Sequence, residues 1–252
     1  MKSIERGLQI LEILANSKSS CGVTEIANIM KLDKSIVFRN LNTMKRSGYV
    51  EQSKEQKKYT LGLKILELSN RLIQKMEITT IARPMLEKLS HISGETSHLA
   101  VLRDGRVIYI DRVESKEILG IHTNVGDHEP LYCTAVGKAI LAFLPPKEVQ
   151  EILKELNLSG FEKFTDDTIT SLSELEIELE NIRKKGFALD NEELYKGVRC
   201  IAAPIKNHEN EVIASLGISG PTSRMMKHKI VRLAALTKEI AGEISEGLGN
   251  LS

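Results

Sequence analysis

The first 60 residues carry the pattern that most constrains the fold of this chain. Three amphipathic segments with helical period are followed by two short alternating runs and a polar turn between them, which predicts a winged helix-turn-helix. The expected helices cover residues 4–15, 24–30 and 33–47, and the expected strands cover residues 49–52 and 57–61. Thr24 is expected to be the N-cap of the second helix. A module of this type places one helix in the major groove of DNA.

The third helix divides into two faces. Val37, Leu41 and Met44 recur at the spacing that buries one side of a helix. The opposite side carries residue types that contact phosphates and base edges, with Arg39 and Asn42 expected on bases. The candidate DNA-contacting residues, completed by lysines of the wing, are Thr24, Lys34, Ser35, Phe38, Arg39, Asn42, Lys45, Arg46, Lys57 and Lys58, with Lys54 as a further wing lysine.

Charge is distributed unevenly along the chain. Residues 1–60 hold 11 Lys and Arg against 6 Asp and Glu, a balance of +5, whereas the other residues hold 24 against 28, a balance of −4. Positive charge therefore lies where DNA binding requires it, although a balance of +5 alone is also within the ordinary scatter of globular domains.

Several classes of protein are disfavoured. There is no apolar run of 18 residues and no signal-peptide pattern at the start, so we expect a cytoplasmic protein without a membrane partner. Cys21, Cys133 and Cys200 are scattered and form no CxxC pair, so neither disulfides nor a metal site is expected, and no cofactor is implied.

The remainder of the chain predicts a linker helix and a second domain of mixed type. Helices are expected at 61–76, 134–144, 147–156, 172–185 and 222–247. A further helix is expected to have Pro84 in its first turn and to run to about His91. Strands are expected at 96–102, 106–112, 118–123, 187–190, 198–205 and 211–219. The fold class is therefore α+β, with the domains expected at 1–61, 62–78 and 79–252.

The segment 126–139 is the first candidate for a ligand site. Thr134 is placed to cap a helix, and the first free N–H groups would belong to Ala135, Val136 and Gly137. Such N–H groups bind a carboxylate or a phosphate. The alternative is an ordinary capped helix in which Gly137 serves close packing.

A second candidate combines Asp190, Cys200 and Ser219, which fall on three successive expected strands. If those strands are neighbours, the three side chains face one cavity and can hold a small polar ligand. Taken singly, a buried cysteine is usually a small apolar residue and an aspartate after a strand usually stabilises a turn. An enzyme that uses Cys200 and Asp190 is the alternative function, and a domain that only binds protein partners is a third.

The chain resembles the IclR family of bacterial transcription regulators over essentially its whole length. The resemblance rests on motifs that occur in the family's order and spacing, at residues 4–11, 34–41, 130–139, 190–193, 197–204 and 218–221. It implies a winged-helix domain, a linker helix and a GAF-like effector domain, assembled as a homodimer or a dimer of dimers that reads a pseudo-palindromic operator.

The resemblance also implies a small carboxylate effector. Its carboxylate would be held by the N–H groups of Ala135 and Val136, with Asp190 and Cys200 beside it. Two serines of some family members align with Gly217 and Ser219, so one hydroxyl is absent here and a bulkier ligand is favoured. The effector-binding residues are then Thr134, Ala135, Val136, Gly137, Asp190, Cys200, Gly217 and Ser219. The 95–99 and 130–132 segments are similar to members that sense 2-keto-3-deoxygluconate.

Overall fold

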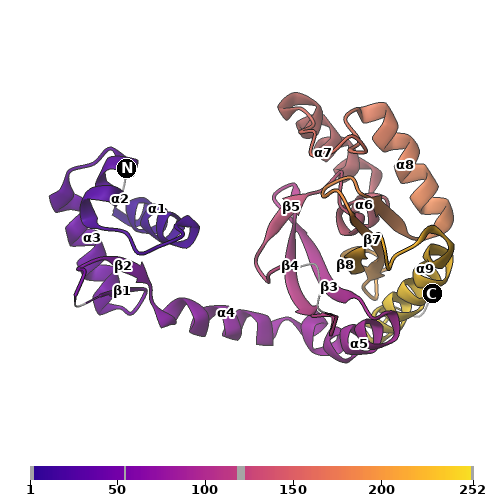
Figure 1. Ribbon diagram of the computed structural model, residues 1–252, viewed down its shortest axis with the longest axis horizontal. Coiled ribbons are helices and arrows are strands. Elements are labelled where there is room, and N and C mark those ends of the chain that lie inside the picture. Colours follow the sequence, from indigo (N-terminus) through magenta and orange to yellow (C-terminus); the bar gives the residue numbers. More distant parts are fainter. Residues whose placement is uncertain (1–2, 54, 118–122, 251–252) are drawn as a thin grey trace. The chain divides into compact units, whose positions relative to one another are not determined.

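The computed structural model describes residues 3–53, 55–117 and 123–250, and the chain divides into two compact units, Met1–Lys75 and Met76–Ser252. The elements of the first unit are α1 (Ser3–Asn16), α2 (Val23–Met30), α3 (Lys34–Arg46), β1 (Val50–Gln52), β2 (Tyr59–Leu61) and α4 (Leu63–Lys75), as Figure 1 labels them. β1 and β2 form the antiparallel wing, with Val50 opposite Leu61. The predicted winged helix-turn-helix is confirmed. The expected wing lysine Lys54 lies outside the described residues.

One small core holds this unit together. The buried residues come from α1, α2, α3, the wing and the segment before α2, and they include Ile10, Ile26, Leu41 and Tyr59. Val37 and Leu41 are buried in this core, as their spacing predicts.

The expected helix cap at Thr24 is wrong. α2 begins at Val23 with Gly22 as its N-cap, and Thr24 is an exposed residue of the first turn. The Glu25 carboxylate reaches back to accept a hydrogen bond from the Gly22 N–H. The carboxylate therefore fixes the start of the helix two residues earlier than a hydroxyl cap at Thr24 would.

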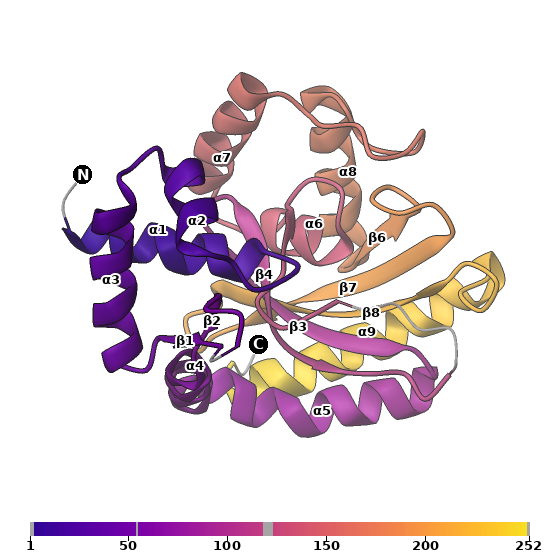
Figure 2. The same ribbon diagram turned by 60° about the vertical axis from the view of Figure 1, so that its left-hand side comes forward.

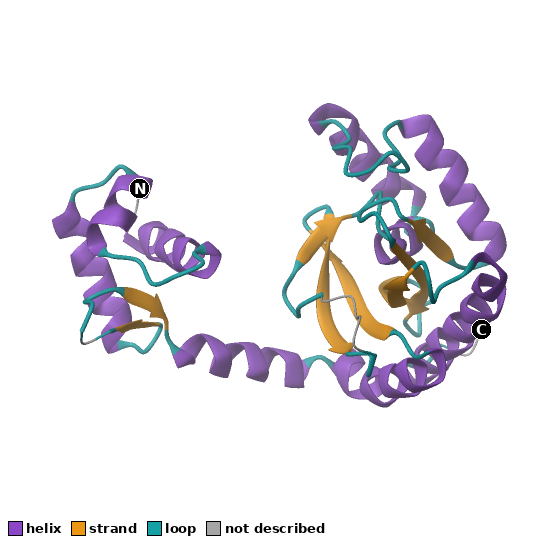
Figure 3. Cartoon of the chain, in the orientation of Figure 1, coloured by secondary structure: helices purple, strands orange, loops and turns teal. Residues whose placement is uncertain are grey.

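The second unit is a six-stranded antiparallel sheet with helices on both faces (Figure 3). Its elements are α5 (Glu77–Ser93), β3 (Thr96–Arg103), β4 (Arg106–Val113), β5 (His128–Pro130), α6 (Ala135–Leu141), α7 (Pro146–Ser159), α8 (Leu172–Lys185), β6 (Ala188–Asn191), β7 (Val198–Lys206), β8 (Val212–Pro221) and α9 (Lys227–Gly247). The strand order is β5-β4-β3-β8-β7-β6, which confirms the expected α+β class.

Two cores lie on the two faces of this sheet. Alternate residues of the central strands, among them Leu99, Ile201 and Ile218, pack against α5 and α9. The other face carries α6, with α7 and α8 beyond it, and Figure 2 shows the two layers of helices with the sheet between them. The strands supply an apolar residue to each face in turn because side chains alternate along a strand.

Three expectations differ from the structure by more than three residues. The six-stranded sheet includes β5, for which no strand was expected. The strand expected at 118–123 falls almost entirely outside the described residues. α5 begins at Glu77, so Pro84 lies in its interior rather than in a first turn. The buried face of α5 continues through the proline from Ile78 to Leu89, so packing outweighs the roughly 3 kcal/mol that an interior proline costs. α9 begins at Lys227, five residues later than expected. Among the described residues, no helix has the length and apolar character needed to cross a membrane.

Candidate nucleic-acid interface and candidate ligand pocket

The outward face of α3 presents the predicted polar residues to solvent. Ser35, Arg39 and Arg46 are exposed, and Asn42 is partly exposed. Phe38 is an apolar residue with 49% of its surface exposed on the same helix. None of the described acidic side chains forms an ion pair with Arg39 or Arg46, so both guanidinium groups are available to a polyanion.

The wing is connected to α3 by a polar contact. The Lys45 ammonium donates a hydrogen bond of 2.9 Å to the Gln52 side chain of β1. Lys57 is exposed at the turn of the wing. Lys58 lies 3.6 Å from the Glu25 carboxylate, so part of its charge is already balanced within the unit. Of the two described wing lysines, Lys57 is therefore the better candidate for a phosphate contact.

The structure brings the predicted pocket residues of the sheet together. Asp190 of β6 lies opposite Cys200 of β7, and Cys200 lies opposite Ser219 of β8, so the three form a row across neighbouring strands. They line one cavity with the start of α6. The space between these side chains that is open to a water-sized sphere is about 20 Å³, roughly one water molecule, so a larger ligand requires the lining side chains to move. The lining residues are His98, Tyr109, Thr123, Glu129, Thr134, Ala135, Val136, Asp190, Leu194, Tyr195, Val198, Cys200 and Ser219.

The start of α6 is capped as predicted, with one difference. The Thr134 hydroxyl accepts a hydrogen bond of 3.1 Å from the Gly137 N–H and donates one of 2.8 Å to the Pro130 carbonyl. Gly137 is therefore not a free donor, contrary to expectation, and the N–H groups left at the helix start belong to Ala135 and Val136. A Cβ on Gly137 would lie 2.3 Å from the Leu131 carbonyl oxygen, so this glycine serves close packing.

Asp190 is the acidic group at the β6 end of the row. The residue is 3% exposed, and its carboxylate accepts a hydrogen bond of 2.7 Å from the Glu193 N–H. Burial raises the pKa of Asp190 to about 6, against the opposing effect of that hydrogen bond and of the Lys138 charge. Lys138 is itself fully buried behind the row, where its ammonium contacts the Leu189 carbonyl at 2.8 Å and Glu193 at 2.6 Å.

Cys200 lacks the chemistry of a catalytic thiol. The Ser219 hydroxyl donates to its sulfur at 3.1 Å. Burial, reinforced by the nearby Asp190 carboxylate, raises the pKa of the Cys200 thiol well above its ordinary value. The thiol stays protonated at neutral pH, and thiols are poor nucleophiles in that form. The geometry therefore disfavours the alternative enzyme built on Cys200 and Asp190.

Several lining residues escape the sequence patterns. His98, Tyr109, Glu129 and Tyr195 all border the cavity, and the Tyr195 hydroxyl donates to the Glu129 carboxylate at 3.1 Å. Each comes from a different turn or strand, and no spacing in the sequence connects them. The sequence contained one indication of these residues, the single histidine, His98, within the apolar run at 96–102. Gly217, expected in the site, lies beneath His98 rather than on the cavity surface.

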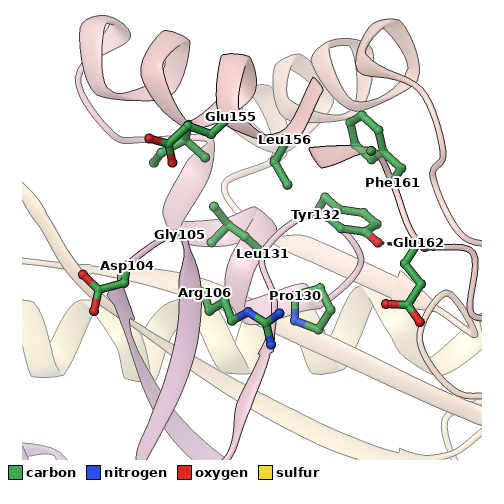
Figure 4. Close-up of a pocket in the computed structure, with 12 residues that line it drawn as sticks. Asp104, Gly105, Arg106, Pro130, Leu131, Tyr132, Glu155, Leu156, Phe161 and Glu162 are labelled. Atoms are coloured by element: carbon green, nitrogen blue, oxygen red, sulfur yellow. Dashed lines mark hydrogen bonds between the residues drawn. The ribbon is translucent and has the colours of Figure 1, made fainter. Parts of the chain in front are cut away.

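A larger hollow lies elsewhere on the second unit, at the β3–β4 turn and beside α7. Its space open to a water-sized sphere is about 480 Å³, and none of the predicted site residues lines it. Figure 4 shows the Arg106 guanidinium beside Pro130, and Tyr132 with its hydroxyl bonded to the Glu162 carbonyl at 2.7 Å. Asp104, Glu155, Glu162 and Arg106 supply its charged side chains, and no residue of a helix start is among its described lining residues.

Comparison with known proteins identifies the family. The IclR helix-turn-helix domain matches residues 3–54, and the domain described as bacterial transcriptional regulator IclR C-terminal matches residues 70–246. The chain belongs to the IclR family. It is 35% identical over 249 residues to the HTH-type transcriptional regulator KdgR of Escherichia coli, covering 99% of this chain and 93% of that protein. The transcriptional repressor IclR of the same organism is 32% identical over 100% of this chain and 91% of its own length.

Solved structures agree with this assignment. The Thermotoga maritima IclR crystal structure superposes with a TM-score of 0.82 at 33% identity, covering 98% of each chain. The C-terminal domain of E. coli KdgR superposes with a TM-score of 0.62 at 34% identity and covers 69% of this chain and 99% of that one. This IclR-family protein is thus a transcriptional regulator with a DNA-binding domain and a C-terminal effector domain. Its relatives are named regulators and repressors, not enzymes.

Proposed function

We propose that this IclR-family regulator is a cytoplasmic repressor whose affinity for a pseudo-palindromic operator is controlled by a small hydroxylated carboxylate. The observation that carries the proposal is the row of Asp190, Cys200 and Ser219, which faces the uncapped N–H groups of Ala135 and Val136 across one cavity. N–H groups at a helix start bind a carboxylate, and Asp190 accepts hydrogen bonds from hydroxyl groups. Repression is proposed because relatives at 29–33% identity are named repressors.

The proposed DNA contacts lie on α3 and the wing. Arg39 and Asn42 contact base edges, and the surrounding polar residues contact phosphates. The proposed boundaries are a DNA-binding domain at 1–61, a linker helix at 62–78 and an effector domain at 79–252. Lys58 is the weakest member of the set, since Glu25 already pairs with it.

The proposed assembly is a homodimer or a dimer of dimers. α4 exposes Leu63, Leu66 and Leu72 with 73%, 58% and 64% of their surfaces accessible, and α1 exposes Ile4 and Leu8. Apolar faces of this kind are covered by association, and two copies would present two α3 helices to successive major grooves. Light scattering of the protein and of a Leu66→Ser, Leu72→Ser variant tests this, and a monomeric unaltered protein contradicts it.

A thermal-shift screen of the full-length protein tests the effector proposal. The first compounds are 2-keto-3-deoxygluconate, which the sequence resemblance suggests, and other keto, hydroxy and sugar acids. A ligand of the native state raises the melting temperature by mass action. The shift is expected to disappear in Asp190→Ala and to persist in Glu176→Gln, an exposed substitution on α8. A ligand that binds Asp190→Ala as tightly as the unaltered protein would place the site elsewhere. Turnover of the compound would instead indicate an enzyme.

A further inference from the structure

His98 is a buried histidine with an unused hydrogen-bonding atom. It lies on β3, only 1% of its surface is exposed, and its ring lines the cavity. The Nε2 atom is 3.5 Å from the Ser219 hydroxyl, whereas Nδ1 has no hydrogen-bond partner among the described residues. A buried polar atom without a partner costs free energy, so its presence in a cavity wall calls for a functional explanation.

The residue opposite His98 on β8 is a glycine, which leaves room for the imidazole ring. His98 is directly opposite Gly217 in the β3–β8 pairing. A Cβ on Gly217 would lie 2.8 Å from Nε2 of His98 and 3.0 Å from a methyl group of Val136. The glycine therefore leaves the space that the imidazole occupies. The Tyr109 ring packs edge to face with the imidazole, with 5.2 Å between the ring centroids.

We propose that His98 is a specificity-determining residue that forms a hydrogen bond with an uncharged oxygen of the effector, and that the pocket selects acids with a single carboxylate. This inference rests on the proposed function, because it assumes that the effector occupies this cavity. It adds a contact on the β3 side, opposite the β6 and β7 side that supplies Asp190 and Cys200.

The charges around the cavity explain the selection. Burial lowers the pKa of His98 to about 4, so the ring is neutral at pH 7 and offers one donor and one acceptor but no positive charge. The charged side chains among the described lining residues are Asp190 and Glu129, both acidic, and no lysine or arginine is among them. A second carboxylate would therefore lose its hydration and meet negative charge, whereas a hydroxyl group would find partners.

Gluconate and glucarate test the selection because they differ only at one end, where a CH₂OH group is replaced by a carboxylate. We would measure the binding of both, and of 2-keto-3-deoxygluconate, to the full-length protein by titration calorimetry. At least one of the two monocarboxylates is expected to bind, and glucarate is expected to bind at least tenfold more weakly. Glucarate binding as tightly as the better monocarboxylate overturns the proposed selection.

Variants of His98 test the contact. His98→Phe keeps a flat ring and removes both nitrogens, so affinity is expected to fall about tenfold. His98→Asn keeps a donor and an acceptor and is expected to retain part of the affinity. Gly217→Ser puts a side chain against the imidazole and is expected to weaken binding as well. His91→Phe, at an exposed position of α5, is the matched control. Thermal melting shows whether each variant is folded.

A nuclear magnetic resonance measurement on the unaltered protein tests the role of His98 without any substitution. In ¹⁵N-labelled protein, ligand binding is expected to shift the His98 ring nitrogen that gains the hydrogen bond. If the ligand binds, and Asp190→Ala abolishes binding while neither the His98 signal nor the His98→Phe affinity changes, the role of His98 is wrong and the proposed function stands. If Asp190→Ala binds normally, the proposed function itself fails. If none of the three acids binds the unaltered protein, the proposed class of effector is wrong.

Discussion

Asp190→Asn is expected to make the protein more stable at alkaline pH while it loses its ligand. Asparagine has the shape of aspartate and its side-chain oxygen can still accept the hydrogen bond from the Glu193 N–H. It cannot ionise. Because burial raises the pKa of Asp190 from 3.8 to about 6, the folded protein binds this proton more tightly than the unfolded chain does. Stability therefore falls as pH rises through that interval, and the substitution removes the loss.

The size of the effect follows from the shift. A difference of about 2 pKa units is worth about 3 kcal/mol once both states are ionised, as at pH 8. At pH 5 the folded state is still protonated and the unfolded state is largely ionised, and the same relation gives about half that value. The variant should therefore gain about 1.5 kcal/mol relative to the unaltered protein between pH 5 and pH 8. Any constant cost of burying the amide cancels in this comparison.

Urea unfolding followed by circular dichroism at pH 5 and pH 8 measures the difference. Glu176→Gln serves as the control, since Glu176 is exposed on α8 and its substitution should leave the pH dependence unchanged. A parallel ligand titration should show that Asp190→Asn binds the effector at least tenfold more weakly. An identical pH dependence in Asp190→Asn and the unaltered protein would refute the argument that burial of this carboxyl opposes folding.

Three further predictions concern DNA binding and packing. Arg39→Ala should weaken operator binding by roughly 1–3 kcal/mol and relax sequence preference, and an equal loss on operator and random DNA in a binding titration would contradict a base contact. Lys57→Ala should reduce the slope of log K against log salt by about 0.9, and an unchanged slope would exclude a phosphate contact. Gly137→Ala should lower the melting temperature, with a cost of about 1–3 kcal/mol, because the methyl group meets the Leu131 carbonyl. Gly242→Ala on α9 has open space and should instead stabilise the protein by roughly 0.5–1 kcal/mol; a similar result for both would refute the packing argument.

The first unit was predictable because its signals are local. Val37 and Leu41 are buried, and Arg39 is exposed, as a period of 3.6 residues requires. The cap at Thr24 was wrong because Glu25, which is adjacent in sequence, supplies a competing interaction with Gly22. Two residues that both favour the start of a helix cannot be ranked by type alone. Their hydrogen bonds decide, and these depend on the chain before the helix.

The candidate ligand pocket was predictable only in part. Asp190, Cys200 and Ser219 could be grouped because successive antiparallel strands pair in a register that their turns restrict. His98 could not be added, since a histidine in an apolar strand shows neither its neighbour Gly217 nor the order of strands that places β3 beside β8. Pro84 shows the same limitation: the buried face of α5 depends on packing against the sheet, which local propensity does not include.

Two titratable groups of this candidate pocket, Asp190 and His98, have one property in common that bears on its role. Burial favours the neutral form of both, with the pKa of Asp190 raised and that of His98 lowered. Apolar side chains in their places would remove these costs, although at position 190 the Glu193 N–H would then lose its acceptor. The Lys138 and Glu193 pair behind the row differs, because its opposite charges meet at 2.6 Å. A ligand with hydroxyl groups and one carboxylate would supply partners to Asp190 and His98, and its binding free energy would then include relief of costs already present in the folded protein. Such a ligand changes the stability of the domain, and a ligand that interacts differently with two states of the regulator is what control of operator affinity requires.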